Sequence, residues 1–176
     1  RSTRMGTDKS QLNFHHQPQW HYLVELLKPF CNHIFISCRK TQSEDFGTQS
    51  LLIDSYEIGP LGGILTAFEY DAHEAWLVAA CDMPFVDHET IAFLVKNRNA
   101  QQTATAFQHP ATQLPEPLIS LWEPSIYKSL TESFQQGQYS PLRVLYKENV
   151  NLLPCPNPHW LINVNTPAEL NKLSKR

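Results

Sequence analysis

The chain has 176 residues, of which 41% are hydrophobic and 18% are charged, and its formal net charge is −3 at pH 7. This length and composition are typical of one globular domain that buries a core of its own. The charge balance argues against a broad basic surface that binds nucleic acid, and we find no apolar stretch of membrane-spanning length.

The first half of the chain alternates between helical and strand patterns. The predicted helices cover residues 18–30, 59–70 and 87–97, with Pro60 as a first helical residue and Asp87 as a cap. The predicted strands cover residues 33–38, 51–54 and 75–81. The last of these is apolar throughout, which is typical of a central parallel strand covered on both faces.

The second half is less regular. We predict strands at residues 103–107 and 116–122, helices at 125–137 and 140–149, a last strand at 160–165, and a terminal helix at 166–173. Gly137 would close the first of these helices, and Thr166 would cap the last. The alternation of strands and helices predicts an α/β fold, with a parallel sheet wrapped by helices in a single domain over residues 1–176.

The cysteines and histidines give no metal-binding pattern. The cysteines are Cys31, Cys38, Cys81 and Cys155, and no pair of them has C-x-x-C spacing. We therefore expect buried free thiols in a reducing compartment, and we place the protein in the cytoplasm. The eight histidines are scattered without ligand spacing, and we assign them to the surface or the core.

Asp82 follows the apolar strand at its carboxyl end. In open parallel sheets the ligand crevice lies beyond this end, and a carboxylate there is costly unless it meets a cation. Mg²⁺ binds one or two carboxylates together with substrate phosphates. An aspartate before Met83 and Pro84 also suits the start of a turn. The residues alone leave a metal ligand and a turn cap both open.

A second aspartate, Asp54, ends the strand at 51–54 and precedes Gly59, Gly62 and Gly63. Glycine lets the backbone approach a flat ligand closely, which makes this segment a candidate binding loop. The alternative is a tight turn with close packing of a helix on the sheet. The glycines by themselves do not decide between the two.

The opening segment, RSTRMGTDKSQL, carries Arg1, Arg4 and Lys9 among small residues. Phosphates bind to backbone N–H groups and to nearby Arg or Lys side chains, so this segment is a candidate phosphate loop. It lacks the G-x-x-x-x-G-K-[ST] spacing of a P-loop. A solvated tail is the other interpretation, but the presence of Asp54 and Asp82 in the same α/β chain favours the phosphate loop.

Five segments of the chain occur together in one order: R-S-T-R-M-G-x-D-K, L-L-I-D-S, G-P-L-G-G-I, A-A-C-D-M-P-F and I-N-V-N-T-P-A-E-L. As a set they resemble the molybdenum cofactor guanylyltransferase family (the molybdopterin-guanine dinucleotide biosynthesis protein A family), within the nucleotidyltransferase superfamily. The resemblance runs from Arg1 to about Leu170. It implies a three-layer, Rossmann-like fold with a mostly parallel central sheet. The family fingerprint begins with L-A-G-G, so we expect that loop part and a short strand upstream of Arg1.

The resemblance also implies roles for single residues. Lys9 matches the lysine that contacts the nucleotide, and Asp54 and Asp82 match the two aspartates of the nucleotide site, Asp82 being also the Mg²⁺ ligand. Gly59 belongs to the nucleotide-binding segment. Ser37 falls where members of the family have an asparagine that contacts GTP, and serine offers one donor fewer.

The acceptor side of the site is implied by two further matches. Asn163 and Asn165 match an N-x-N-T-P segment near the active cleft, although turn formation and helix capping would also explain them. The segment 113–122 loosely resembles the one that receives the second substrate.

The implied reaction transfers GMP from GTP to the terminal phosphate of molybdenum-molybdopterin and releases pyrophosphate, with Mg²⁺ on Asp82. Arg4 and Lys9 would balance the charge that develops on the phosphates. Expected partners are GTP, molybdopterin or its molybdenum form, and transiently other cofactor-biosynthesis proteins. A cytidylyltransferase or sugar-phosphate nucleotidyltransferase of the same fold is one alternative, although G-P-L-G-G-I resembles the guanylyl branch. A non-catalytic nucleotide-binding relative is the other.

Overall fold

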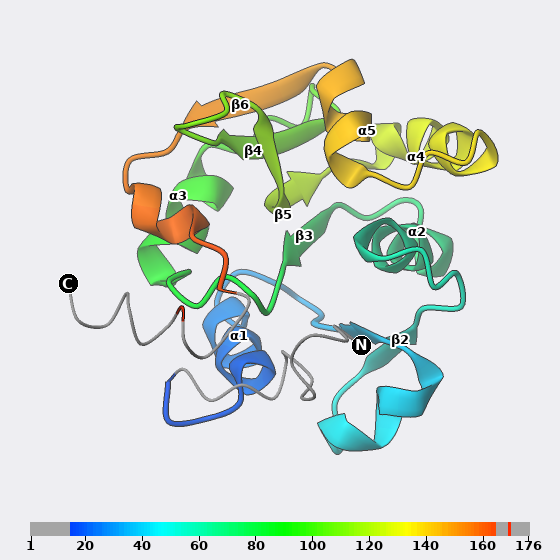
Figure 1. Cartoon of the computed structure of the whole chain (residues 1–176), viewed down its shortest axis with the longest axis vertical. Coiled ribbons are helices and arrows are strands. Elements are labelled where there is room, and N and C mark those ends of the chain that lie inside the picture. Colours follow the sequence, from blue (N-terminus) through cyan, green and yellow to red (C-terminus); the bar gives the residue numbers. More distant parts are fainter. Residues whose placement is uncertain (1–14, 165–168, 170–176) are drawn as a thin grey trace.

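The structure, a computed structural model, describes residues 15–164 and 169 (Figure 1). The α-helices are α1 (Gln19–Leu27), α2 (Pro60–Tyr70), α3 (His88–Lys96), α4 (Tyr127–Gln135) and α5 (Pro141–Lys147). The 3₁₀ helices are η2 (Lys40–Phe46), η3 (Pro124–Ile126) and η4 (Pro158–Leu161). The strands are β1 (Ile36–Cys38), β2 (Leu51–Ile53), β3 (Trp76–Ala79), β4 (Ala104–Gln108), β5 (Pro115–Trp122) and β6 (Val150–Pro154).

The described strands form two sheets. The larger one has the order β3-β5-β4-β6, in which β5 runs antiparallel to both of its neighbours and β6 runs parallel to β4. Strands β3, β4 and β6 therefore share one direction. The smaller sheet is the parallel pair β1-β2. This arrangement confirms the predicted α/β fold with a sheet rich in parallel strands.

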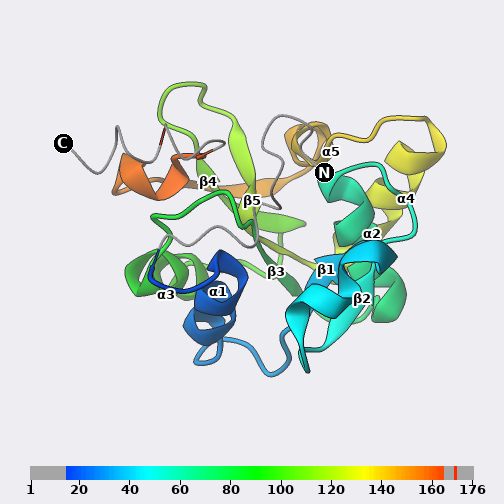
Figure 2. The same ribbon diagram turned by 60° about the horizontal axis from the view of Figure 1, so that its bottom comes forward.

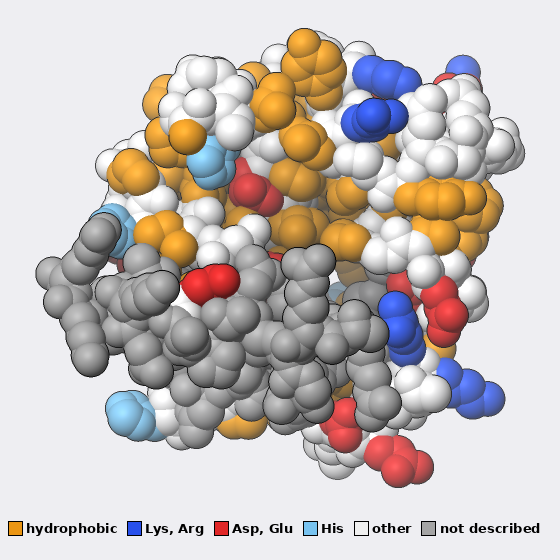
Figure 3. All heavy atoms as spheres, in the orientation of Figure 1, with side chains coloured by type: hydrophobic (Ala, Val, Ile, Leu, Met, Phe, Trp, Pro, Cys, Tyr) orange, Lys and Arg blue, Asp and Glu red, His pale blue; other side chains and the backbone are white. Residues whose placement is uncertain are grey.

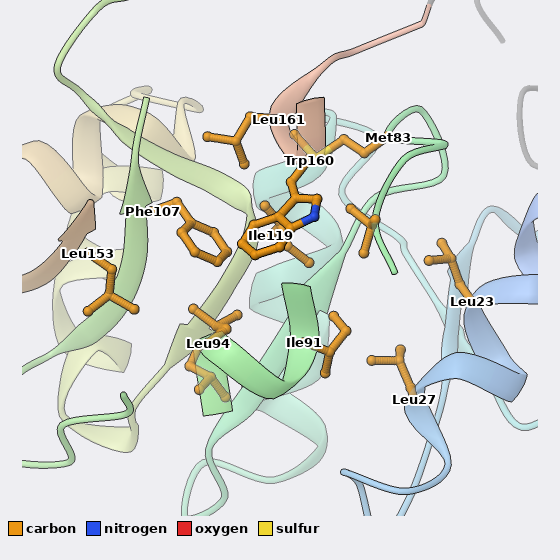
Figure 4. Packing of buried hydrophobic residues seen from close by; sticks show 12 residues of the cluster. Leu23, Leu27, Met83, Ile91, Leu94, Phe107, Ile119, Leu153, Trp160 and Leu161 are labelled. Atoms are coloured by element: carbon orange, nitrogen blue, oxygen red, sulfur yellow. The ribbon is translucent and has the colours of Figure 1, made fainter. Parts of the chain in front are cut away.

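Two hydrophobic clusters cover opposite faces of the larger sheet and create three layers (Figure 2). In β4 the side chain of Phe107 belongs to one cluster and that of Ala106 to the other, as the two-residue period of a strand requires. Helices α1, α3 and η4 complete the first cluster, whereas α2, α4 and α5 complete the second. In Figure 4, Phe107, Ile119, Leu94 and Trp160 point toward one another in the first cluster.

Local signals place several helix ends correctly. Helix α2 begins at Pro60, directly after Gly59, whose φ of 79° favours glycine. Helix α3 is capped by Asp87, whose Oδ1 accepts a 2.8 Å hydrogen bond from the N–H of Thr90. Helix α4 is followed by Gly137 at φ 69°. These residues confirm the helix boundaries expected from the sequence.

The predicted last strand at residues 160–165 is wrong. Residues 158–161 form the 3₁₀ helix η4, because Pro158 suits a first helical position and the side chain of Asn157 accepts a hydrogen bond from the N–H of His159 (3.1 Å). The last described strand is β6, which the sequence pattern did not reveal. Of the predicted terminal helix at 166–173, the structure describes only Glu169, which is helical.

Strand β3 differs from the prediction in its pairing and in its burial. Its neighbour in the sheet is the antiparallel β5, and its residues are half-buried rather than covered on both faces. Because Ala80 N–H donates to Leu118 O (2.9 Å), the alternating residues Leu77 and Ala79 direct their N–H groups away from β5. That edge lines a groove between the two sheets.

The cysteines are all free thiols, as predicted, although only Cys38 is fully buried and the other three are half-buried. Burial raises the pKa of the Cys31 thiol, which keeps it protonated and unreactive. Across residues 15–164 and 169, none of the helices has the length and apolar character that a membrane span requires.

Candidate functional site

Asp82 lies in the turn that follows β3, where it is held by the segment after η4. Its backbone oxygen accepts a 2.7 Å hydrogen bond from the N–H of Val164. With the amide of Asn163 oriented to satisfy both partners, its nitrogen donates to Asp82 Oδ1 at 2.9 Å and to Asp82 O at 3.2 Å. The structure thus brings together Asp82 and Asn163, two residues predicted for different sides of the site.

The loop after Asp82 is also held by α1 and by a residue that precedes α1. His15 Nε2 donates to Pro84 O (2.8 Å), and Tyr22 Oη donates to Val86 O (3.1 Å). The rings of His15 and Tyr22 stack with their centroids 3.8 Å apart. These contacts hold in place the backbone that directly follows Asp82. In the sequence His15 is one of several scattered histidines, because no local pattern marks a contact with so distant a proline.

Asp54 and Ser37 are positioned by the glycines of α2. Asp54 Oδ1 accepts a hydrogen bond from the N–H of Tyr56 (2.9 Å). A Cβ atom at Gly62 would lie 2.7 Å from Asp54 Oδ1, and one at Gly63 would lie 2.6 Å from Ser37 Oγ. Such distances are too short for any side chain, so these two glycines allow close packing of helix on sheet. This observation supports the packing interpretation for Gly62 and Gly63.

A groove of about 950 Å³ collects the predicted nucleotide-side residues that the structure describes. Ser37, Asp54, Gly59 and Asp82 all line it. Its walls include apolar side chains of α1, β1 and β3, and it runs between the two sheets. Pockets of this size, mostly apolar with a few converging polar groups, are typical of small-molecule sites.

We expect Gly62→Ala to push the Asp54 carboxylate out of place. The affinity for a nucleoside triphosphate should then fall about tenfold, the equivalent of one lost hydrogen bond to a charged group, as measured by calorimetric titration. Alanine is the better helix former by about 0.5–1 kcal/mol, so the variant should stay folded. Thr131→Ala, in α4 away from the groove, is the control. Unchanged affinity in Gly62→Ala would show that Asp54 takes no part in binding.

A second, smaller pocket of about 540 Å³ is lined in part by Asn163. It is lined by the turn after β4, the start of β5 and η4, with His109, Glu116, His159 and Asn163 as its polar side chains. Burial raises the pKa of the Glu116 carboxyl, and Asp82 adds to this rise, whereas His109 opposes it. The family resemblance links segment 113–122 to the acceptor only loosely, and no sequence pattern marks either histidine as a site residue.

The residues fit a Mg²⁺ ion that is completed by substrate. Within residues 15–164 and 169, no group of three or more His, Cys, Asp or Glu side chains converges as a metal site. Asp82 alone is consistent with Mg²⁺, which takes one or two carboxylates and fills its other positions with phosphate oxygens and water. Arg4, Lys9 and Asn165, also predicted for the site, lie outside the described residues.

Comparison with known sequences points to one family. A family model described as the MobA-like NTP transferase domain matches residues 1–152. The chain is 28% identical to a molybdenum cofactor biosynthesis bifunctional protein of Synechocystis, over 99% of this chain and 51% of that protein, so it spans about half of that relative's length. It is 26% identical to a molybdenum cofactor guanylyltransferase of Pseudomonas putida, over 97% of this chain and 91% of that one.

Solved structures agree with this assignment. Molybdopterin-guanine dinucleotide biosynthesis protein A of Archaeoglobus fulgidus matches with a TM-score of 0.79 at 25% identity, covering 99% of this chain and 94% of that one. The 2-C-methyl-D-erythritol 4-phosphate cytidylyltransferase of Thermus thermophilus matches with a TM-score of 0.73 at 11% identity, covering 96% and 94%, which shows a shared fold alone. Since the family model matches most of its length, the chain belongs to the MobA-like NTP transferase family.

Proposed function

We propose that this protein transfers GMP from GTP to the terminal phosphate of molybdopterin or its molybdenum form, releasing pyrophosphate. One observation carries the proposal: the hydrogen-bonded pair Asp82 and Asn163 contributes to the lining of two hollows. Asp82 lines the larger groove and Asn163 lines the smaller pocket, so two substrates could meet at their junction. The names of the Pseudomonas and Archaeoglobus relatives support the choice of nucleotide and acceptor.

The arrangement suits a displacement at phosphorus. Phosphoryl transfer places the attacking and leaving oxygens roughly in line, on opposite sides of the reacting phosphorus. In our proposal GTP occupies the groove beside Ser37, Asp54 and Gly59, and the acceptor phosphate enters past Asn163 from the smaller pocket. Holding two reactants in such an alignment can contribute roughly 7–11 kcal/mol to lowering a barrier.

The chain's own residues then have two tasks. Two anionic phosphates must approach each other, and we assign their neutralisation to Arg4 and Lys9 of the opening segment. Asp82 would hold Mg²⁺, which supplies Lewis-acid polarisation of the phosphoryl oxygens when it is bound. The attacking phosphate is already ionised near pH 7, so no side chain has to act as a general base.

The test is a transfer assay with purified protein, Mg²⁺ and molybdopterin, in which pyrophosphate release is followed with GTP or with CTP. We expect release with GTP and tighter calorimetric binding of GTP than of CTP. Lys9→Ala should weaken both binding and rate, because a cation that neutralises phosphate acts in the bound state and in the transition state. A change in thermal stability alone would make the opening segment a solvated tail.

Two other outcomes would replace the proposal. Preference for CTP would indicate the cytidylyl variant of the same fold, and Ser37, which offers fewer donors than asparagine, is the position at which we would look for the cause. Nucleotide binding without pyrophosphate release would indicate a non-catalytic binding relative. We place the reaction in the cytoplasm, in keeping with four free cysteine thiols, and we expect transient contacts with other cofactor-biosynthesis proteins.

A further inference from the structure

The smaller pocket contains an acidic group that the transfer reaction does not need. Glu116, at the start of β5, is half-buried and faces the pocket. Figure 3 shows, on the face of the molecule that it presents, an acidic side chain beside a histidine in a hollow of the surface. A carboxylate repels phosphate, so it does not serve to bind the acceptor's anionic end. Removing a carboxylate from water is costly without compensation, which calls for a partner on the ligand.

The geometry of Glu116 leaves part of its carboxylate available. Its Oε1 accepts a hydrogen bond from the N–H of Leu118 (3.0 Å), which fixes the orientation of the group. In the part of the chain that the structure describes, Oε2 has no hydrogen-bond partner. An ionised carboxylate is an acceptor only, with room for about four hydrogen bonds over its two oxygens. It therefore matches a ligand edge that presents N–H donors side by side.

The neighbouring residues complete a pattern for a flat heterocycle. His109 Nδ1 accepts a hydrogen bond from the N–H of Ala111 (3.3 Å), which leaves Nε2 as the ring nitrogen that can donate to a ligand carbonyl. His159 packs edge-on against Phe85, with ring centroids 6.2 Å apart, and adds a flat ring to the lining. The pocket's volume of about 540 Å³ accommodates a bicyclic ring system with a short side chain.

We propose that Glu116 is a specificity-determining residue for the acceptor, and that its carboxylate accepts from the two adjacent N–H groups of a 2-amino-4-oxopyrimidine edge, as carried by a pterin. The pairing resembles the bidentate contact between a guanidinium group and a carboxylate. With the pterin in the smaller pocket, the phosphate end of the acceptor extends past Asn163 toward Asp82. This inference rests on the proposed function, since it names the recognition of that reaction's second substrate.

The test changes the ligand and the protein in parallel. Neopterin 3′-phosphate and its 2,4-dioxo counterpart, which replaces the 2-amino donor by an oxygen, are titrated by their own fluorescence with GTP at saturation. GTP is included because the pterin carries the same edge as guanine and would otherwise bind in the nucleotide groove. The wild-type protein should bind the pterin at least tenfold more tightly than the dioxo compound, because the latter directs an oxygen at the carboxylate.

In Glu116→Gln this preference should disappear, and the dissociation constant for the pterin should rise at least tenfold. Glu116→Asp, which keeps the charge on a shorter side chain, should retain part of the preference and serves if the glutamine variant is unstable. The affinity for GTP should change less than twofold in all variants. Glu44→Gln, an exposed glutamate on η2, is the matched control and should leave every constant unchanged.

Several results would overturn the inference: no pterin binding by the wild type, equal binding of both compounds, an unchanged preference in Glu116→Gln, or displacement of the pterin by GTP. Its failure can be told apart from failure of the proposed function. If pyrophosphate is released but the preference for the pterin over the dioxo compound does not depend on Glu116, only this inference is wrong. Pterin recognition through Glu116 without pyrophosphate release would remove the proposed transfer and leave the pocket assignment standing.

Discussion

Asp82→Ala is expected to lower kcat/KM for pyrophosphate release by about 10²–10³-fold, as the loss of one preorganised charge-stabilising group costs roughly 3–4 kcal/mol of barrier. The fold should survive. The N–H of Val164 donates to the backbone oxygen of Asp82 and not to its side chain, so this hydrogen bond remains in the variant. Steady-state kinetics at varied Mg²⁺ concentration, with circular dichroism of each variant, is the measurement.

Two matched variants separate charge from position. Asp82→Asn keeps the shape of the side chain but removes its charge, and it should be nearly as inactive as Asp82→Ala if the carboxylate acts on Mg²⁺. Asp71→Ala removes a half-buried aspartate that follows α2 and lines the same groove, and it should retain activity. Turnover of Asp82→Ala close to that of the wild type would exclude a metal role and leave the turn-cap interpretation.

The position of Asp82 could be predicted because two local signals coincide there. An apolar run indicates a buried strand, and the first acid after it indicates the edge at which α/β proteins bind ligands. Asp54 and Gly59 could be predicted for a similar reason, since Asp54 ends a short strand and Gly59 precedes a helix, whereas Ser37 was singled out only by the resemblance to the family. These features depend on residues close together in the sequence.

The pairing of Asp82 with Asn163 could not be derived from local pattern. It depends on η4, whose apolar residues Trp160 and Leu161 resemble a strand in sequence but are buried by a 3₁₀ turn. The smaller pocket was missed for a related reason. Its polar residues come from the turn after β4, from the start of β5 and from the segment after β6, so only the tertiary fold brings His109 and Glu116 next to Asn163.

A second large effect is expected from the ion pair between Arg98 and Glu123, which joins the end of α3 to the end of β5. Arg98 Nε donates to Glu123 Oε1 (2.7 Å) and Nη2 donates to Oε2 (2.8 Å), so the pair is bidentate. The Glu123 side chain is only 3% exposed, whereas the Arg98 side chain is 42% exposed. Hydrogen bonding to Glu123 raises the pKa of Arg98, in keeping with a stable charged pair.

Arg98→Ala should therefore destabilise the fold mainly through the carboxylate that it leaves unpaired. Breaking a buried pair costs about 3–5 kcal/mol, and the exposure of Arg98 places this case near 3 kcal/mol. For a chain of this length that corresponds to a fall in Tm of roughly 6–12 °C, measured by thermal unfolding. Lys128→Ala breaks the exposed pair with Glu132 and should change stability by less than about 0.5 kcal/mol.

The double variant Arg98→Leu with Glu123→Leu distinguishes an unpaired charge from lost packing. If the cost in Arg98→Ala comes from the buried carboxylate, removing both charges should restore most of the lost stability, because apolar residues of similar volume often replace a buried ion pair without loss. If the double variant is as unstable as Arg98→Ala, the fold depends on the geometry of the bidentate contact itself, and the electrostatic explanation is wrong.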